Sequence, residues 1–291
     1  MNIPILGTGL SGLVGSRIVE LLGNVYDFTD LSFATGVDIT DYDKVLERLE
    51  SNPAQVIIHM AAKTDVDSCE DDKILGEEGS AWNVNVLGTK NIVDAAKKIG
   101  KRVLYISTDF VFDGSLPNYA EDAEPNPVNW YGYTKYEAEQ YLINSGINYS
   151  ILRLAYPYRS FFPEKLDFVR RIIEKAKKGE KIFALTDHIF TPTFIDDIAV
   201  TLDVLLEKKA TGIFHVVGSQ SLTPFEATDI ILKKFNIEAR IEKINRETYF
   251  KDRAFRPFKL ALKNDRISKL GVKMMGFSEG LDEVKRQLAG Y

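Results

Sequence analysis

The stretch "ILGTGLSGLVGSRIVELL", residues 5–22, decides the expected fold of the chain. An apolar run leads into a loop in which Gly9, Gly12 and Gly15 are spaced by three, and apolar residues then recur at helical intervals. One glycine permits a tight turn, another lets the backbone approach a pyrophosphate, and a third allows close packing of helix on strand. The helix start adds N–H groups and a partial positive charge. Because the loop lies between a strand and a helix, the pattern predicts a dinucleotide site.

The first half of the chain continues this alternation of strand and helix. Short apolar runs that predict buried strands lie at residues 3–6, 25–28, 56–60, 103–107 and 150–154. Stretches with helical spacing lie between them, at 13–22, 42–49, 81–99 and 131–144. Such alternation predicts right-handed βαβ units and an α/β fold with a Rossmann-type doubly wound parallel sheet. Ligands of these sheets bind beyond the carboxyl ends of the strands.

The alternation becomes less regular after about residue 154, and the last 50 residues are basic and less regular in pattern. Helical patterns at 166–177, 196–206 and 224–235 mix there with short strands at 181–184 and 214–217. We therefore expect a dinucleotide-binding domain over residues 1–154, with a returning segment near 186–217. A smaller, mainly substrate-binding part over 155–291 would cover the crevice.

Composition limits the classes of function. The chain has 291 residues, 45% hydrophobic and 27% charged, which is ordinary for a globular protein. A net charge of −5 without a basic stripe argues against nucleic acid as a partner. The sequence has no apolar run of about 20 residues for a membrane span, and its first residues lack the features of a signal peptide. Cys69 is the only cysteine, which suits a reducing compartment, so we expect a cytoplasmic protein.

An acidic residue after the second strand would bind a ribose hydroxyl and disfavour the 2′-phosphate of NADP. Asp30, in "VYDFTDLS" at 25–32, lies at about the right distance, with Asp27 and Thr29 as rivals. The stretch contains no arginine that would pair with a phosphate. The sequence therefore predicts NAD(P)H as the cofactor and favours NADH over NADPH.

A tyrosine and a lysine share one helix face in "NWYGYTKYEAEQYL", residues 129–142. Tyr131 and Lys135 are four residues apart, so they lie one above the other on a helix. A free tyrosine has a pKa of about 10, and a nearby ammonium would stabilise its phenolate. Moving the pKa to 7 requires about 4 kcal/mol of such stabilisation, which needs a partly desolvated site. The alternative is that Tyr131 packs on the sheet while Lys135 extends to solvent.

The strand "RVLYISTDFVFDG", residues 102–114, places Ser107, Thr108 and Asp109 at the rim where ligands bind. These parts suit hydride transfer between a nicotinamide and a carbonyl. Tyr131 would give or take the proton of the carbonyl oxygen, and Thr108 or Ser107 would hydrogen-bond that oxygen. Lys135 would tune Tyr131 and hold the nicotinamide ribose.

The sequence resembles the extended short-chain dehydrogenases/reductases and, more narrowly, the dTDP-4-dehydrorhamnose reductase family, which belongs to dTDP-rhamnose biosynthesis. The segments that carry this resemblance are "GTGLSGLVGS" at 7–16, "DITD" at 38–41, "HMAAKTDVDSCE" at 59–70, "STDFVFDG" at 107–114, "YGYTK" at 131–135, "TPTFIDDIA" at 191–199, "GIFHVVGS" at 212–219 and "RAFRP" at 253–257. They extend through nearly the whole chain.

The resemblance implies NADPH- or NADH-dependent reduction of the 4-keto group of a dTDP-linked deoxysugar. It implies that the cofactor lies along Gly12, Leu13 and Val14 at the pyrophosphate, Asp38 and Ile39 near the adenine, and Ala61, Ala62 and Lys63 after the third strand. Thr108, Tyr131 and Lys135 would form the catalytic set, with Asp109 next to the substrate. A homodimer is possible. No residues for the family's magnesium site are found, and the three histidines lack the spacing of metal ligands.

Three segments depart from the family pattern, all in the substrate-facing half. "RLAYPYRS" at 153–160 has Tyr156 as the nearest aromatic where a tryptophan is usual, "DHIF" stands at 187–190, and "FKLAL" at 258–262. The identity of the sugar is therefore left open. Arg256 suits a nucleotide phosphate, and a structural ion pair is an equal alternative.

Two other functions remain as alternatives. A nucleotide-sugar epimerase would need the same threonine, tyrosine and lysine, and Asp30 would suit a retained NAD. A dehydratase is disfavoured because Phe110 stands where such enzymes tend to have a glutamate. A non-catalytic subunit is the second alternative, since the regulatory subunit of methionine adenosyltransferase resembles these reductases.

Overall fold

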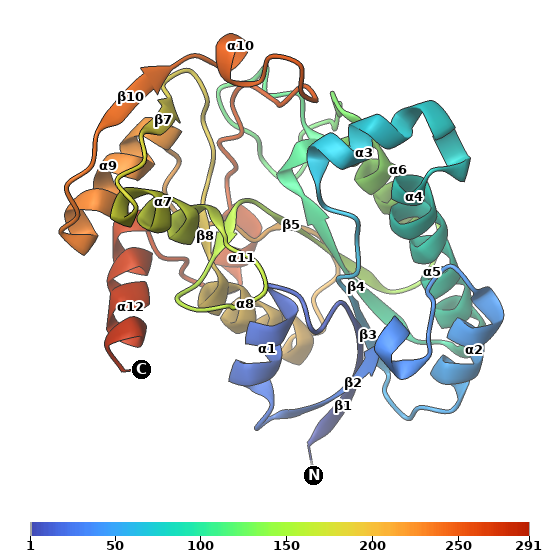
Figure 1. Ribbon diagram of the computed structural model, residues 1–291. Coiled ribbons are helices and arrows are strands. Elements are labelled where there is room, and N and C mark those ends of the chain that lie inside the picture. Colours follow the sequence, from blue (N-terminus) through green and yellow to red (C-terminus); the bar gives the residue numbers. More distant parts are fainter. Residues whose placement is uncertain (1, 291) are drawn as a thin grey trace.

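The computed structural model describes residues 2–290 and is built around one parallel sheet of six strands (Figure 1). In spatial order the strands are β2 (Tyr26–Leu31), β1 (Ile3–Thr8), β3 (Val56–His59), β4 (Arg102–Thr108), β5 (Tyr149–Leu154) and β9 (Gly212–His215). The chain runs outward from β1 to β2 and then returns to β3 on the other side of β1. The predicted doubly wound α/β fold is confirmed, and its switch point lies between β1 and β3.

Helices cover both faces of this sheet. One face packs on α1 (Gly15–Leu22) and α8 (Ile195–Glu207). The other face packs on α2 (Tyr42–Glu50), α5 (Gly88–Ile99) and α6 (Trp130–Asn144). In β1, successive residues point to opposite faces, so Ile5 joins the first core and Leu6 the second. Both faces of the strands are therefore apolar, which explains their continuous apolar runs.

The predicted helix over residues 81–99 is interrupted. It consists of α4 (Ser80–Trp82), a π-helical segment (Asn83–Leu87) and α5, which ends at Gly100 with a φ of 73°. The π-helical segment contains Asn85, whose side chain accepts from the Lys63 amide at 2.8 Å and donates to Thr134 Oγ1 at 3.0 Å. The irregular turn thus connects the loop after β3 to α6.

The second part of the chain has its own small core. β7 (Ile182–Leu185) pairs with β10 (Ile241–Ile244), and β6 (Pro157–Tyr158) pairs with β8 (Thr193–Phe194). The helices α7 (Phe168–Lys177), α9 (Pro224–Phe235) and α12 (Phe277–Ala289) lie to the left of the central sheet in Figure 1. An aromatic cluster that includes Tyr158, Phe190 and Phe277 fills the space between them.

The last 50 residues, which the sequence predicts to be less regular, contain the 13-residue helix α12, which was not predicted. Its apolar face packs on this aromatic cluster. The short remaining elements are the helices α3 (Val66–Asp72), α10 (Arg246–Tyr249) and α11 (Asp265–Lys269), with 3-10 turns at Phe33–Thr35, Lys73–Glu78 and Asp109–Val111. Among residues 2–290 no helix has the length and apolar character that a membrane crossing requires.

Candidate active site

A cavity of about 1350 Å³ opens at the carboxyl edge of the sheet, between the glycine loop and the second part of the chain. Most of the predicted site residues line it, namely Gly9, Gly12, Leu13, Val14, Gly15, Asp38, Ile39, Ala61, Ala62, Ser107, Thr108, Asp109, Tyr131, Tyr156 and Arg256. Asp30, Lys63 and Lys135 are not among the residues that line it. The fold thus brings residues that are 120 or more positions apart in the sequence around one space.

The glycine loop has no room for side chains at two of its positions. Gly9 has a φ of +68°, and a Cβ atom there would lie 2.8 Å from the Ala61 amide nitrogen. A Cβ atom on Gly15 would clash with the carbonyl oxygen of Gly9. At Gly12 the nearest atom, the Gly9 carbonyl oxygen, would be 3.3 Å away. Two glycines are therefore required by packing, and Gly12 keeps the loop surface free for a ligand.

The start of helix α1 suits a phosphate. Its N-cap is Val14, and among residues 2–290 no side chain caps its first turn. Gly12 to Gly15 line the cavity, so N–H groups and the positive end of the helix dipole are available there. A buried hydrogen-bond chain positions the facing loop: Thr8 Oγ1 contacts His59 Nδ1 at 2.7 Å and accepts from the Ala61 amide at 3.0 Å. The loop from Gly12 to Gly15 at the start of α1 therefore fits the pyrophosphate of a dinucleotide.

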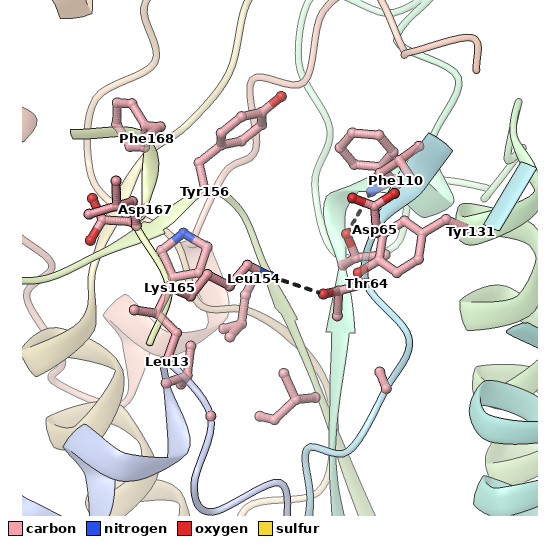
Figure 2. A pocket seen from close by; sticks show the side chains of 18 of the residues that line it. Leu13, Thr64, Asp65, Phe110, Tyr131, Leu154, Tyr156, Lys165, Asp167 and Phe168 are labelled. Atoms are coloured by element: carbon pink, nitrogen blue, oxygen red, sulfur yellow. Dashed lines mark hydrogen bonds between the residues drawn. The ribbon is translucent and has the colours of Figure 1, made fainter. Parts of the chain in front are cut away.

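Thr108, Asp109 and Tyr131 meet at the end of β4. Thr108 Oγ1 donates to Asp109 Oδ1 at 3.1 Å and accepts from the Phe110 amide at 3.2 Å. Tyr131 comes from the first turn of α6, which begins after Asn129 because the Asn129 side chain accepts from the Gly132 amide at 2.8 Å. Figure 2 shows Tyr131 and Phe110 on the same side of the pocket.

Burial raises the pKa of Tyr131 well above its ordinary value. A hydrogen bond with Thr108 opposes this shift, and the charges of Asp109 and Cys69 add to it. Tyr131 is therefore a protonated phenol at neutral pH and is equipped to give a proton rather than to take one.

Lys135 lies behind the cavity wall. Its side chain is buried, Nζ donates to the Ile106 carbonyl oxygen at 2.7 Å, and Nζ lies 4.1 Å from the centre of the Tyr105 ring. Burial lowers the pKa of Lys135 to about 7, while Glu139 acts in the opposite direction. The alternative in which Lys135 extends to solvent is wrong. The effect of Lys135 on the pKa of Tyr131 stays a prediction, because burial, Thr108 and the nearby acidic groups cause the shift of Tyr131 in this structure.

Asp109 is a buried carboxyl group at the site. Its side chain is 2% exposed, and burial raises its pKa to about 7, although hydrogen bonds from Thr108 and from the backbone oppose the shift. Oδ2 has no hydrogen-bond partner within residues 2–290. The sequence placed Asp109 at the rim but gave no sign of this burial.

The opposite wall carries Tyr156 and His188. Tyr156 has a φ of 42°, a conformation that a bulky residue rarely adopts, and its hydroxyl lies 3.4 Å from His188 Nε2. Burial and the charge of Arg246 lower the pKa of His188 to about 4, so the imidazole is neutral at pH 7. Arg256 forms an ion pair with Asp67 and also lines the cavity, so its contact with a nucleotide phosphate stays a prediction.

Several cations of the cavity were missed by the motif-based analysis. They are Lys165, Arg171, Lys175 and Arg253. Lys165 extends across the pocket and donates to Thr64 Oγ1 at 3.5 Å (Figure 2). Arg253 opens the segment "RAFRP", where no role was assigned to it, and the only sequence signal for the other three was the basic character of their segments, which is also typical of solvated helix ends.

Two predicted cofactor ligands have protein partners. Asp30 Oδ2 accepts from Ser32 Oγ at 2.5 Å, and Ser32 lines the cavity. Lys63 Nζ donates to Ser80 Oγ at 2.7 Å and pairs with Asp72 at 3.3 Å. The Lys63 side chain therefore holds the loop after β3 against α4.

A parallel sheet with a glycine loop at its switch point, and a threonine and a tyrosine facing one cavity, defines the class of extended short-chain dehydrogenases/reductases. Within it, the chain matches the RmlD substrate binding domain family over residues 1–289, and it belongs to that family. The family resemblance predicted from the sequence is confirmed.

Individual relatives support the same placement. A dTDP-4-dehydrorhamnose reductase from Aggregatibacter actinomycetemcomitans is 31% identical over 231 residues, which is 76% of this chain and 76% of that protein. Methionine adenosyltransferase 2 subunit beta from Bos taurus is 30% identical over 254 residues, or 81% of this chain and 74% of that protein. A solved dTDP-4-dehydrorhamnose reductase from Bacillus anthracis str. Ames, in complex with NADP, has a TM-score of 0.90 and 29% identity, covering 99% of this chain and 100% of that one. The chain is thus similar over its whole length to NAD(P)-dependent oxidoreductases of this type.

Proposed function

We propose that the protein uses NAD(P)H to reduce the 4-keto group of a nucleotide-linked deoxysugar. The observation that carries this proposal is that the glycine loop and the Thr108–Tyr131 pair line the same cavity. A phosphate-binding loop alone would support only nucleotide binding. A protonated phenol in the same space adds the group that a carbonyl reduction requires.

The cofactor would lie with its pyrophosphate on Gly12 to Gly15 and its adenosine near Asp38 and Ile39. When bound, its nicotinamide supplies the hydride. Asp30 and Ser32 would meet the adenosine ribose, and the charge of Asp30 would favour NADH over NADPH. The solved reductase in complex with NADP is a relative that takes the phosphorylated form.

Tyr131 would act as the proton donor. Its raised pKa keeps the phenol protonated at neutral pH. As negative charge develops on the substrate oxygen, the phenolic proton moves to that oxygen, and Thr108 Oγ1 hydrogen-bonds the same atom. Such general acid catalysis contributes about 10²–10⁴-fold. Lys135 would stabilise the phenolate that remains. To hold the nicotinamide ribose as well, its ammonium group would have to leave the Ile106 carbonyl oxygen and reach the cavity from behind its wall.

The second part of the chain would bind the nucleotide sugar. Arg171, Lys175 and Arg253 line this part of the cavity, together with the acidic Glu164 and Asp167, and their cationic groups suit a diphosphate. Tyr156 and Asp109 would lie beside the sugar. The division at residue 154 and a homodimer stay predictions.

The test is an assay of reduced nicotinamide oxidation with dTDP-4-keto-6-deoxysugars. We expect turnover that depends on both substrates, and a cofactor that exchanges freely with the solution. A cofactor that stays bound through purification and turns over without net oxidation would favour an epimerase. Absence of turnover with each of these sugars, in a folded protein that binds NAD(P)H, would contradict the proposal.

A second candidate function rests on the similarity to methionine adenosyltransferase 2 subunit beta. In that case the protein would bind a synthetase subunit and the Thr108–Tyr131 pair would have no catalytic role. Titration with the purified catalytic subunit of methionine adenosyltransferase distinguishes the two functions. Complex formation with a Tyr131→Phe variant as strong as with the unaltered protein, together with no ketone reduction, would favour this second function.

A further inference from the structure

Phe33 is an exposed aromatic residue at the wall of the cavity. It follows β2, is 79% exposed, and lines the same space as the glycine loop. A single apolar residue on an outer surface is ordinary. Phe33 differs because it lines a cavity, where its uncovered ring can pack on a ligand and leave water on binding.

The turn that carries Phe33 is held by backbone and hydroxyl hydrogen bonds. Thr35 Oγ1 accepts from the Ser32 amide at 3.0 Å, and the Val37 amide donates to the Ser32 carbonyl oxygen at 2.8 Å. Gly36 closes the turn with a φ of 79°, a conformation that favours glycine. The turn therefore holds Phe33 at the cavity without help from packing of its ring.

The residues on either side of this turn supply an apolar floor. Leu31, Val37 and Ile39 line the cavity, are at most 7% exposed, and belong to the core on the α2 and α5 side of the sheet. Every nucleobase has a flat π-face that packs on aromatic side chains. An aromatic ring next to a buried apolar floor therefore suits a nucleobase.

The position of Phe33 along the sheet indicates which base it would meet. The strands lie in the order β2, β1, β3 and β4. Phe33 follows β2, the glycine loop follows β1, and Thr108 ends β4. Neighbouring strands are about 4.8 Å apart, so the ends of β2 and β4 are separated by roughly 14 Å. A dinucleotide has its pyrophosphate between its two bases, so a nicotinamide at Thr108 and a pyrophosphate on the glycine loop leave the adenine for Phe33.

We propose that the adenine ring of the cofactor stacks on Phe33, and that this contact determines how tightly the enzyme holds its dinucleotide. The inference rests on the proposed function and adds an affinity-determining residue outside the glycine loop. Stacking of a base on an aromatic side chain is lost when alanine replaces that side chain. For Phe33→Ala we expect a loss of about tenfold or more in affinity. The loss should be equal for NADH and NADPH, because the contact is with the face of the base and not with the 2′ position.

The experiment measures the Kd values of NADH, NADPH and AMP in four proteins. They are the unaltered protein, Phe33→Ala, Phe33→Tyr and the control Ile74→Ala, whose side chain is 90% exposed and does not line the cavity. Fluorescence titration gives the first two Kd values, and displacement of NADH gives that of AMP. We expect Phe33→Ala to weaken all three ligands by a similar factor. Phe33→Tyr, which keeps the ring, should stay within about threefold of the unaltered protein, and the control should be unchanged.

AMP identifies the part of the cofactor that Phe33 contacts, because it carries the adenine and lacks the nicotinamide. Thermal unfolding should be the same in all four proteins, since Phe33 and Ile74 are exposed. The value of kcat at saturating NADH should also be unchanged in Phe33→Ala, because Phe33 follows β2 and the Thr108–Tyr131 pair lies at the end of β4.

Equal Kd values for Phe33→Ala and the unaltered protein would overturn this inference and leave the proposed function intact. A loss of NADH affinity without a loss for AMP, or a Phe33→Tyr variant that binds as weakly as Phe33→Ala, would overturn it as well. If the unaltered protein binds NADH but reduces no sugar, the proposed function fails and the Kd comparison still decides this inference. If the unaltered protein binds neither NADH nor NADPH, both proposals fail.

Discussion

The ammonium group of Lys135 donates a 2.7 Å hydrogen bond to the carbonyl oxygen of Ile106. This bond joins helix α6 to strand β4 two residues before Thr108. The bond fixes α6 along the direction of β4. Tyr131 lies one turn before Lys135 on the same helix, so the bond helps to place Tyr131 beside Thr108. The Lys135 side chain reaches this position at the cost of burial, which lowers its pKa to about 7.

Replacing Lys135 should lower activity and raise stability. In Lys135→Met we expect activity to fall by about 10²-fold or more, because the support for the Tyr131 phenolate is lost. The variant should be more stable than the unaltered protein at pH 6, by about 2–5 kcal/mol, because it buries no ammonium.

The pH dependence of this difference follows from the sign of the shift. The pKa of Lys135 is lower in the folded state than in the unfolded state. The destabilisation caused by burying its ammonium group is therefore fully present below pH 7 and disappears as pH rises toward 10.5. Urea unfolding at pH 6 and at pH 9.5 measures it, with the exposed Lys97→Met as a control. A stability difference that does not shrink at the higher pH would contradict the account.

Two glycines of the loop should respond differently to alanine. Gly15→Ala should lower thermal stability and cofactor affinity together, because its Cβ atom would clash with the Gly9 carbonyl oxygen. Gly12→Ala should perturb the fold less than Gly15→Ala, since its Cβ atom would make a tight 3.3 Å contact with the Gly9 carbonyl oxygen that a shift of a few tenths of an ångström relieves, but it should weaken NAD(P)H binding about tenfold or more. Fluorescence titration with NAD(P)H and a thermal melt test both variants. Equal affinities of Gly12→Ala and the unaltered protein would show that the cofactor does not lie on this loop.

The buried carboxyl group of Asp109 should make stability depend on pH. Its pKa is raised to about 7, so Asp109 costs no stability below pH 3.8, and its destabilising contribution develops as the pH rises through 7. Asp109→Asn removes this dependence and should be more stable than the unaltered protein at pH 8, by up to about 4 kcal/mol. The difference should approach zero near pH 4. Parallel unfolding curves with Asp122→Asn, which changes an exposed carboxylate, provide the comparison.

Cofactor choice should depend on the charge at the end of β2. Asp30→Asn keeps an oxygen for the Ser32 hydroxyl but removes the negative charge that, in the proposed complex, would lie near the adenosine ribose. We expect kcat/KM for NADPH to rise about tenfold relative to NADH, which corresponds to 1.4 kcal/mol. Steady-state kinetics with both cofactors measure this ratio. If the ratio stays the same, the 2′ position of the cofactor lies away from Asp30.

Local sequence signals predicted the elements that form the site. Gly9, Gly12 and Gly15 predicted the loop, because only glycine fits at Gly9 and Gly15. The Tyr131–Lys135 spacing depends on neighbours within one helical turn, so α6 was predicted within one residue of its start. The parallel, doubly wound character of the sheet followed from the alternation of strand and helix.

Features that depend on distant contacts were not predicted. The π-helical turn at Asn85 is determined by partners in another loop and another helix, Lys63 and Thr134. The left-handed backbone of Tyr156 results from its aromatic neighbours rather than from its own preference. Asp109 is buried because β4, α6 and the second part of the chain pack together around it. A sequence pattern does not predict contacts between such distant segments.

The most direct test of the account is the rate of ketone reduction in Tyr131→Phe. Phenylalanine keeps the ring that packs against Phe110 at 5.8 Å and removes only the hydroxyl group. We predict that kcat falls by about 10²–10⁴-fold while the Kd for NAD(P)H changes little. Tyr133→Phe, which alters an exposed tyrosine on another face of the same helix, should retain full activity. A Tyr131→Phe variant that turns over as fast as the unaltered protein would contradict the role of this phenol as proton donor.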